Sequence, residues 1–126
     1  MDLSARNLDD VVILKPSGRI DHTSASAFQD SLLAQVAEAG ETKHQILLDM
    51  TGLAYMSSVG LRALMMAAKA AKKNDGVIVV AALQPEMKEI FEISRFHFIF
   101  KTFDTVEEAL KGMSTSAHAA FAAEGA

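Results

Sequence analysis

The sequence contains no cysteine, and this absence excludes disulfides, thiolate metal sites and cysteine nucleophiles. Positive charge is also scarce: 12 basic against 16 acidic residues give a net charge of -4, opposite in sign to that of a typical nucleic-acid-binding domain. The N-terminus lacks the basic and apolar stretches of a signal peptide, and the later apolar runs are too short or too interrupted by lysines to span a bilayer. We therefore expect a cytoplasmic protein that binds neither nucleic acid nor membrane.

The length and composition are those of one folded domain. Of the 126 residues, 50% are hydrophobic and 22% are charged, and this balance excludes intrinsic disorder. A chain of this size buries about two thirds of its surface on folding, which is enough for a core without metal ions or disulfides. We expect one domain over residues 1–113, followed by a flexible tail rich in alanine and serine over residues 114–126.

Apolar periodicity predicts strands that alternate with helices. The expected strands cover residues 3–8, 11–14, 45–49 and 77–81, and the expected helices cover residues 21–39, 57–74, 85–93 and 106–113. The first two strands have no helix between them, so they should pair antiparallel at one edge of the sheet. The pattern favours an α/β domain with a mixed, mostly parallel sheet covered by about four helices.

The expected helix over residues 57–74 has two apolar faces. On a helical wheel, one face gathers the residues that we expect in the core, which are Leu61, Leu64, Met65, Ala68 and Ala71. Nearly opposite lies a narrower apolar stripe, bordered by Arg62, Lys69 and Lys73, that consists of Val59, Ala63, Met66 and Ala70. Such a stripe is typical of a contact with another protein or with a second copy of the chain. Alanine is also a good helix former, so the stripe alone does not require a partner.

Two serines stand where this helix should begin. Ser57 is a natural N-cap, because a serine hydroxyl can accept a hydrogen bond from an unpaired backbone N–H of the first turn. Gly60 is unexpected in a first turn, where glycine costs about 1 kcal/mol relative to alanine. We therefore expect another part of the chain to approach Gly60 closely.

These residues and three other segments resemble the STAS domain, the family of the anti-sigma-factor antagonists. The resemblance covers residues 5–112 and rests on Gly18-Arg19-Ile20-Asp21, on the strand over residues 44–49, on the segment Tyr55-Met56-Ser57-Ser58-Val59-Gly60-Leu61, and on Gln84-Pro85 with the apolar positions that follow. It implies a single STAS-like domain.

The resemblance also implies a site. Ser58 matches the first serine of the family's pair, which is the phosphoacceptor in members regulated by serine kinases, and Ser57 is the alternative acceptor. Asp21 matches the acidic residue that lies near the phosphorylation site in the family. Two positions depart from the family pattern, because Ser57 replaces the usual acidic residue and Val59 replaces the second serine.

What the resemblance implies for function is partner switching. The unphosphorylated protein would bind an anti-sigma factor or GHKL-type serine kinase, phosphorylation of Ser58 would release it, and a PPM-type serine phosphatase would reverse the modification. The expected partner surface consists of Asp21, His22, Thr23, Ser57, Ser58, Val59, Arg62, Ala63, Met66, Lys69 and Ala70. The two departures leave a second hypothesis open, in which the chain is a STAS interaction module or scaffold that does not switch.

No motif in the sequence indicates an enzyme. The histidines at 22, 44, 97 and 118 show no metal-ligand spacing, and Ser58 has no evident set of histidine and acid partners. Phosphate-binding fingerprints of the P-loop and Gly-x-Gly-x-x-Gly types are absent. Four methionines, at 56, 65, 66 and 87, could line a small-ligand pocket, although filling the core is their commoner role. We expect no catalysis, no metal ion and no cofactor.

Overall fold

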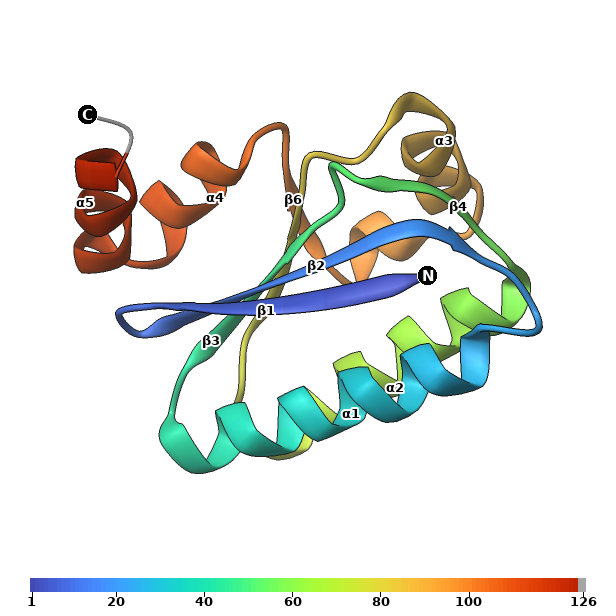
Figure 1. The fold of residues 1–126 in the computed structure, drawn as a ribbon, viewed down its shortest axis with the longest axis horizontal. Helices are drawn as coiled ribbons and strands as arrows, with labels where there is room; N and C mark the ends of the chain where they lie inside the picture. Colours follow the sequence, from blue (N-terminus) through green and yellow to red (C-terminus); the bar gives the residue numbers. More distant parts are fainter. Residues whose placement is uncertain (125–126) are drawn as a thin grey trace.

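A six-stranded sheet with helices on both faces organises the chain in this computed structural model, which describes residues 1–124 (Figure 1). The strands are β1 (Asp2–Leu8), β2 (Val11–Ile20), β3 (Gln45–Asp49), β4 (Leu53–Met56), β5 (Ile78–Ala81) and β6 (Lys101–Phe103). The helices are α1 (Ala25–Thr42), α2 (Ser58–Lys73), α3 (Pro85–Ile93), α4 (Val106–Met113) and α5 (Thr115–Glu124), and a short 3-10 turn, η1 (Phe96–Phe98), precedes β6. Within this described part of the chain, no helix combines the length and the apolar character needed to cross a membrane.

The sheet is mixed and mostly parallel. Its strand order is β1-β2-β3-β5-β6. The remaining strand, β4, pairs with the last residues of β2. β1 and β2 pair antiparallel, whereas the other pairs are parallel, so the predicted antiparallel N-terminal edge is confirmed. β2 is long enough to serve two partners, because its first residues, Val11 to Leu14, pair with β3 and its last residues, Gly18 to Ile20, pair with β4.

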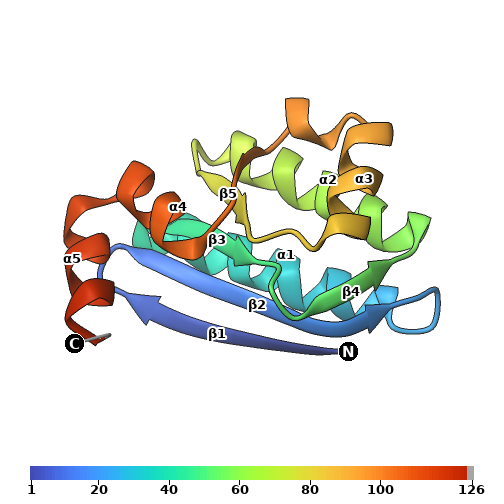
Figure 2. The same ribbon diagram turned by 90° about the horizontal axis from the view of Figure 1, so that it is seen from above.

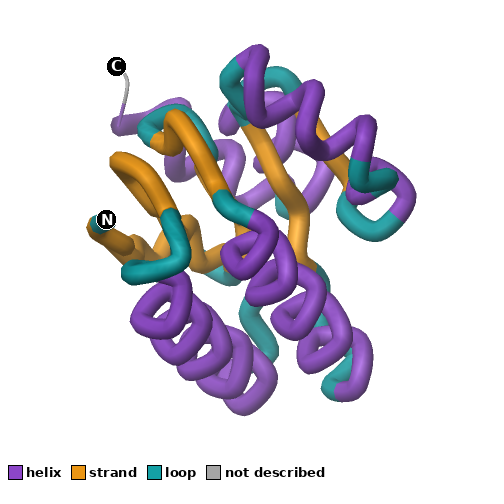
Figure 3. The backbone as a smooth tube through the Cα atoms, turned by 90° about the vertical axis from the view of Figure 1, so that its right-hand side faces the viewer, coloured by secondary structure: helices purple, strands orange, loops and turns teal. Residues whose placement is uncertain are grey.

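Side chains of the central strands alternate between two cores, as the two-residue repeat of a strand requires. On β2, Val12 and Leu14 enter the core that α1, α2 and α3 cover, and Val11 and Ile13 enter the core that α4 and α5 cover. The two long helices α1 and α2 lie side by side on one face of the sheet, and α4 and α5 lie on the other (Figures 1 and 3). The covering of both faces explains why the strands read as continuous apolar runs.

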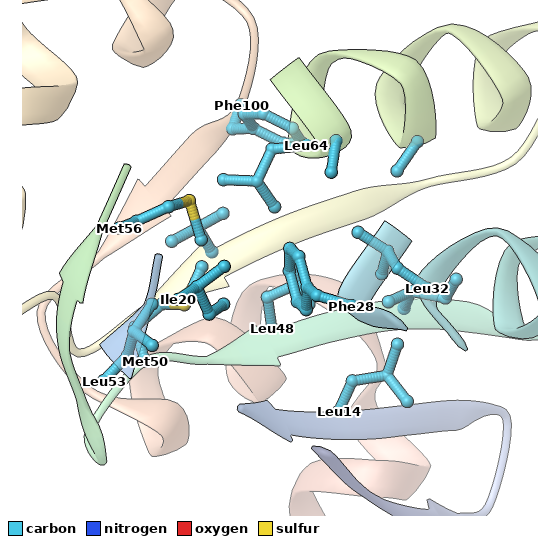
Figure 4. Close-up of a cluster of buried hydrophobic side chains, with 14 of the residues drawn as sticks. Leu14, Ile20, Phe28, Leu32, Leu48, Met50, Leu53, Met56, Leu64 and Phe100 are labelled. Atoms are coloured by element: carbon cyan, nitrogen blue, oxygen red, sulfur yellow. The ribbon is translucent and has the colours of Figure 1, made fainter. Parts of the chain in front are cut away.

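The first core extends to the end of the sheet where β2 and β4 finish. Ile20 and Met56, the last residues of these strands, are buried beside Phe28 of α1 and Leu64 of α2 (Figure 4). The loops that follow both strands therefore start from a close-packed base, and this base fixes their positions.

Most of the chain after residue 113 forms a helix that lies against the second core. Ten residues form α5, with Ala117 fully buried in the second core and Phe121 half-buried against it. Arg6 of β1 forms an ion pair with Glu124, the last residue of this helix. Residues 125 and 126 of the predicted tail lie outside the described part of the chain.

Two strands lie outside the segments that the sequence predicts as strands. They are β4 (Leu53–Met56) and β6 (Lys101–Phe103). Ile93, which its spacing places on the apolar side of the helix over 85–93, is 76% exposed, because only Met87 and Phe91 of that helix are buried.

Candidate functional site

The parallel pairing of β2 and β4 brings the two candidate segments together. Ile20 and Met56 are register partners, and the backbone N–H of Ser57 donates a hydrogen bond to the carbonyl of Ile20, with an N to O distance of 2.7 Å. Asp21 and Ser57 are the next residues along their strands, so they leave the sheet side by side. The ends of β2 and β4 and the start of α2 meet at one end of the molecule (Figure 2).

The two serines take different positions at the start of α2. Ser57 is the N-cap with an extended backbone, and its hydroxyl oxygen accepts a hydrogen bond from the backbone N–H of Gly60 at 3.3 Å. The predicted N-cap is therefore confirmed, and Ser57 is half-buried. Ser58 is the first residue of the helix and its side chain is exposed. Ser58 is therefore the more exposed residue of the pair.

Gly60 lies where the end of the sheet touches the helix. A Cβ at this position would lie 2.5 Å from Cγ of Met56 and 3.0 Å from Cγ2 of Ile20. A distance of 2.5 Å is shorter than packed carbon atoms allow and 3.0 Å is unusually tight, so the predicted close approach is confirmed. Glycine at 60 lets the first turn of α2 rest directly on the last residues of β2 and β4.

Asp21 organises the loop between β2 and α1. Its Oδ1 accepts hydrogen bonds from the Thr23 hydroxyl at 2.6 Å and from the backbone N–H groups of Thr23 and Ser24 at 2.9 and 3.1 Å. These hydrogen bonds lower the pKa of Asp21 from 3.8 to about 2, and the bond from the Thr23 hydroxyl contributes most. The carboxylate therefore keeps its negative charge throughout the physiological pH range. His22 and Thr23 are exposed beside it.

One row of residues on α2 faces solvent. It consists of Val59, Arg62, Met66, Lys69 and Lys73, spaced alternately by three and four positions as a helix face requires. Val59 and Met66 are 45% and 37% exposed, so this row presents two large apolar side chains between positive charges. We call it the α2 outer row.

The structure corrects one member of the predicted apolar stripe. Ala63 points from α2 into the first core, where it is fully buried, so it cannot contact a partner. Ala70 is half-buried. Ala63 is buried because α1 packs along α2. The buried face of α2 is therefore centred on Ala63 and Ala67 as well as Leu64. A helical wheel alone does not indicate this second neighbour.

A cation–π contact beside the site was not predicted. The Arg19 guanidinium carbon lies 4.5 Å from the ring centre of Tyr55, and these two residues are register partners on β2 and β4. The contact depends on the pairing of β2 with β4, and no periodic pattern in the sequence indicates a strand as short as β4.

The histidines do not form a metal site. Among residues 1–124, no group of three or more histidine or acidic side chains could hold a metal ion together. His44 contacts the hydroxyl of Thr42 at 2.6 Å, and His118 lies 3.5 Å from the carboxylate of Glu107, far from Ser58 in the fold. The arrangement at the ends of β2 and β4 thus offers an exposed hydroxyl, a carboxylate and an exposed apolar row.

Comparisons with known proteins agree with one another. The model of the STAS domain family matches residues 2–109. A protein of Bordetella bronchiseptica described as an anti-sigma factor antagonist, BtrV, is 33% identical over 116 residues, which cover 92% of this chain and 97% of that relative. A crystal structure described as an anti-sigma factor antagonist from Thermotoga maritima superposes with a TM-score of 0.79 at 20% identity, covering 87% of this chain and 92% of the other. The phosphorylated form of the Bacillus cell fate determinant SpoIIAA superposes with a TM-score of 0.65 at 17% identity, covering 90% of this chain and 100% of the other.

Proposed function

The chain belongs to the STAS domain family, and from that membership we propose that it is an anti-sigma-factor antagonist that works by partner switching. In its unphosphorylated form it binds an anti-sigma factor or a related GHKL-type serine kinase. Phosphorylation of Ser58 releases that partner, and a PPM-type serine phosphatase restores the binding form. The relative described as an anti-sigma factor antagonist, which matches nearly the whole chain, supports the partner class.

The observation that carries the proposal is the exposure of Ser58 beside a fixed negative charge and an exposed apolar row. The proposed partner surface consists of Asp21, His22, Thr23, Ser57, Ser58, Val59, Arg62, Met66, Lys69 and Ala70. Ser58 lies at the edge of the α2 outer row, so a partner covering Val59 and Arg62 also covers the serine hydroxyl. A modification at this one atom then acts on the whole contact.

The phosphate acts on the complex and leaves the fold intact. It adds about -1.5 to -2 charges at the N-terminus of α2, where the helix dipole favours an anion by roughly 0.3–1 kcal/mol. Burying the same charge against a partner costs several kcal/mol. The carboxylate of Asp21, which the low pKa keeps ionised, adds repulsion of the same sign. Turning an almost fully bound protein into an almost fully free one needs about 5.5 kcal/mol, and a buried phosphate can supply most of it.

The direct test compares three full-length variants as baits in extracts of the native cells. We expect wild type and Ser58→Ala to capture an anti-sigma factor or serine kinase, and Ser58→Asp to capture at least tenfold less of it. Thr115→Asp is the matched control, because Thr115 is the exposed first residue of another helix, α5, on the opposite face of the sheet. It should capture the partner like wild type.

One result would contradict the switch, and another would contradict Ser58 as its acceptor. One is equal capture by Ser58→Asp and wild type, together with phosphate-free Ser58 by mass spectrometry of the protein from growing cells. That result favours the non-switching interaction module, to which the exposed Val59 at the family's second serine position also points. The other is phosphate on Ser57 alone, which would move the acceptor to the N-cap.

A further inference from the structure

β1 forms one edge of the sheet, and its outer side is open (Figure 2). It is the first strand in the sheet order, and among residues 1–124 only β2 pairs with it. The middle of the strand is exposed at four successive residues, Ser4, Ala5, Arg6 and Asn7. The row of backbone N–H and C=O groups on such an edge can pair with a further strand.

β1 also lacks the features by which edge strands usually avoid such pairing. It is seven residues long, contains no proline, and keeps an unbroken register with β2 from Asp2 to Leu8, without a bulge. The opposite edge differs, because β6 has only three residues. Of these two edges, β1 is therefore the one suited to extending the sheet.

The hairpin that joins β1 to β2 determines which backbone groups of β1 point outward. Leu8 and Val11 flank its two-residue turn, and residues in these places form a hydrogen-bonded pair. Such pairs recur at every second residue along an antiparallel ladder. The residues between them, Leu3, Ala5 and Asn7, therefore direct their N–H and C=O groups away from β2.

Two features of β2 agree with this assignment. The carbonyl of Asp10, just before β2, accepts a hydrogen bond from the N–H of Gln45 in β3 at 2.9 Å, so the next carbonyl, that of Val11, faces β1. Pro16, which has no N–H to donate, lies opposite Leu3, where no bond to β1 is required. The outward row of β1 is thus available to a second strand.

A second copy of β1 fits this row best in one register. Two antiparallel copies bond through their outward residues when the numbers of the two facing residues add to an even number. Of these registers, only the one centred on Ser4 places Asp2 opposite Arg6 of the second copy, and symmetry makes this pair occur twice. A shift to the next such register in either direction would place Ser4 or Leu8 opposite Asp2 instead.

Arg6 can contribute to this contact without leaving its present partner. Its side chain lies on the α5 side of the sheet, where it forms an ion pair with Glu124 and is still 51% exposed. A guanidinium has five N–H donors, so it can bind the carboxylate of Glu124 and that of Asp2 from the second copy together.

We propose that this chain forms a homodimer in which two copies of β1 pair antiparallel about Ser4 and join the two sheets into one. One strand edge from each copy makes a small contact, so the dimer is weak and forms at high micromolar concentrations. The proposed partner surface contains no residue of β1. The dimer therefore goes beyond the partner switch and does not depend on the state of Ser58.

Charge reversal tests the register, with the full-length protein in sedimentation-velocity experiments. We expect Asp2→Arg and Arg6→Asp, each alone, to dimerise about tenfold or more weakly than wild type, because each places two like-charged pairs face to face. An equimolar mixture of these two variants should regain most of the wild-type affinity as a heterodimer. Glu89→Arg and Lys111→Asp change the net charge by the same amounts at exposed positions outside β1 and should each dimerise like wild type.

Ala5→Pro tests the backbone pairing. Proline removes the outward N–H of residue 5 and no bond to β2, so the variant should keep its circular dichroism spectrum and lose the dimer. Ala5→Val keeps this N–H at the same exposed position and should dimerise like wild type. If Ala5→Pro failed to fold, the mixture of charge-reversal variants would still decide.

Four results would overturn the proposal. The first is a wild type that stays monomeric at about 1 mM. The second is a pair of charge-reversal variants that each dimerise like wild type or whose mixture regains nothing. The third is a folded Ala5→Pro that dimerises like wild type, and the fourth is a dimer that Phe98→Ser, at an exposed position outside β1, dissociates. Ser58→Asp should dimerise like wild type, so failure of the switch leaves the dimer standing.

Discussion

Ser57 and Ser58 are neighbours in sequence, and the difference between them decides how this site can act. The hydroxyl of Ser57 accepts a hydrogen bond from Gly60 as the N-cap of α2, so its modification would disturb the start of the helix. Removing an N-cap serine typically costs about 1 kcal/mol. Ser58 has an exposed side chain one residue later, where added charge leaves the cap untouched. The structure thus gives a physical reason for a proposed acceptor at 58 rather than 57.

Acid should weaken the fold through Asp21. The pKa of this carboxyl is lowered from 3.8 to about 2 in the folded protein, chiefly by the hydrogen bond from the Thr23 hydroxyl. Because the folded pKa lies below the unfolded value, the carboxylate stabilises the fold fully above about pH 5, and this contribution is lost as the pH falls toward about 2. We expect Asp21→Asn to flatten the fall in melting temperature over this range.

An NMR titration tests the cause of that shift. Thr23→Val removes the hydroxyl donor and should raise the pKa of Asp21 toward 3.8, whereas Thr115→Val, at an exposed threonine of α5, should leave it at about 2. An Asp21 pKa that stays low in Thr23→Val would mean that the two backbone N–H donors suffice.

At the scale of elements, the packing of the first turn of α2 against the ends of β2 and β4 fixes the geometry of the site. Gly60→Ala tests this contact, because the new methyl group would lie 2.5 Å from Met56 Cγ and 3.0 Å from Ile20 Cγ2. Overpacking a core costs about 1–3 kcal/mol, while alanine gains up to about 1 kcal/mol in helix propensity. We expect the packing term to win and the free energy of unfolding to fall by about 1–2 kcal/mol.

Urea denaturation measures that change. Lys69→Ala, an exposed position of the same helix, is the control and should alter the free energy of unfolding by less than about 0.5 kcal/mol. A Gly60→Ala protein that is more stable than wild type would show that the helix start can move away from the strands.

The sequence predicts this fold well where one periodic pattern decides an element, and less well where a neighbour decides it. The strands β3 and β5 and the helices α1 and α2 are predicted correctly as elements, whereas the prediction for β2 stops at Leu14 and the strand continues to Ile20. β4 has only four residues, and its strand conformation depends on pairing with the end of β2. α5 is rich in alanine on all sides, so its sequence shows no apolar stripe, and only the sheet beneath it distinguishes Ala117 and Phe121 as inward positions.

The same division holds for the site. The N-cap at Ser57 and the close approach at Gly60 could be predicted from the sequence, whereas the functional roles of Ser58 and Asp21 remain predictions from the resemblance. The burial of Ala63 and the contact between Arg19 and Tyr55 could not, because each depends on an element distant in sequence, α1 in one case and the β2–β4 pairing in the other.

At the scale of the whole molecule, α2 joins the proposed partner surface to the core. Its first turn bears Ser58, and its buried face, with Ala63, Leu64 and Ala67, packs into the first core. The helix therefore gives the proposed partner surface a rigid base.

The two cores share the strands of one sheet, so the whole chain should unfold in one step. Phe121→Ala removes a half-buried ring from the second core and should lower the free energy of unfolding by about 1–2 kcal/mol, less than the 3–5 kcal/mol for a fully buried phenylalanine.

Tyr55, the only tyrosine in a chain without tryptophan, lies at the other end of the sheet beside the site. Its fluorescence should report the same shift in the urea midpoint as circular dichroism of all the helices, because each central strand supplies side chains to both cores. Exposed Ala123→Ser on the same helix should leave both midpoints in place. If Phe121→Ala moved only an early circular-dichroism phase and left the Tyr55 transition unchanged, α5 would be an independent unit that lies on the sheet without stabilising the site.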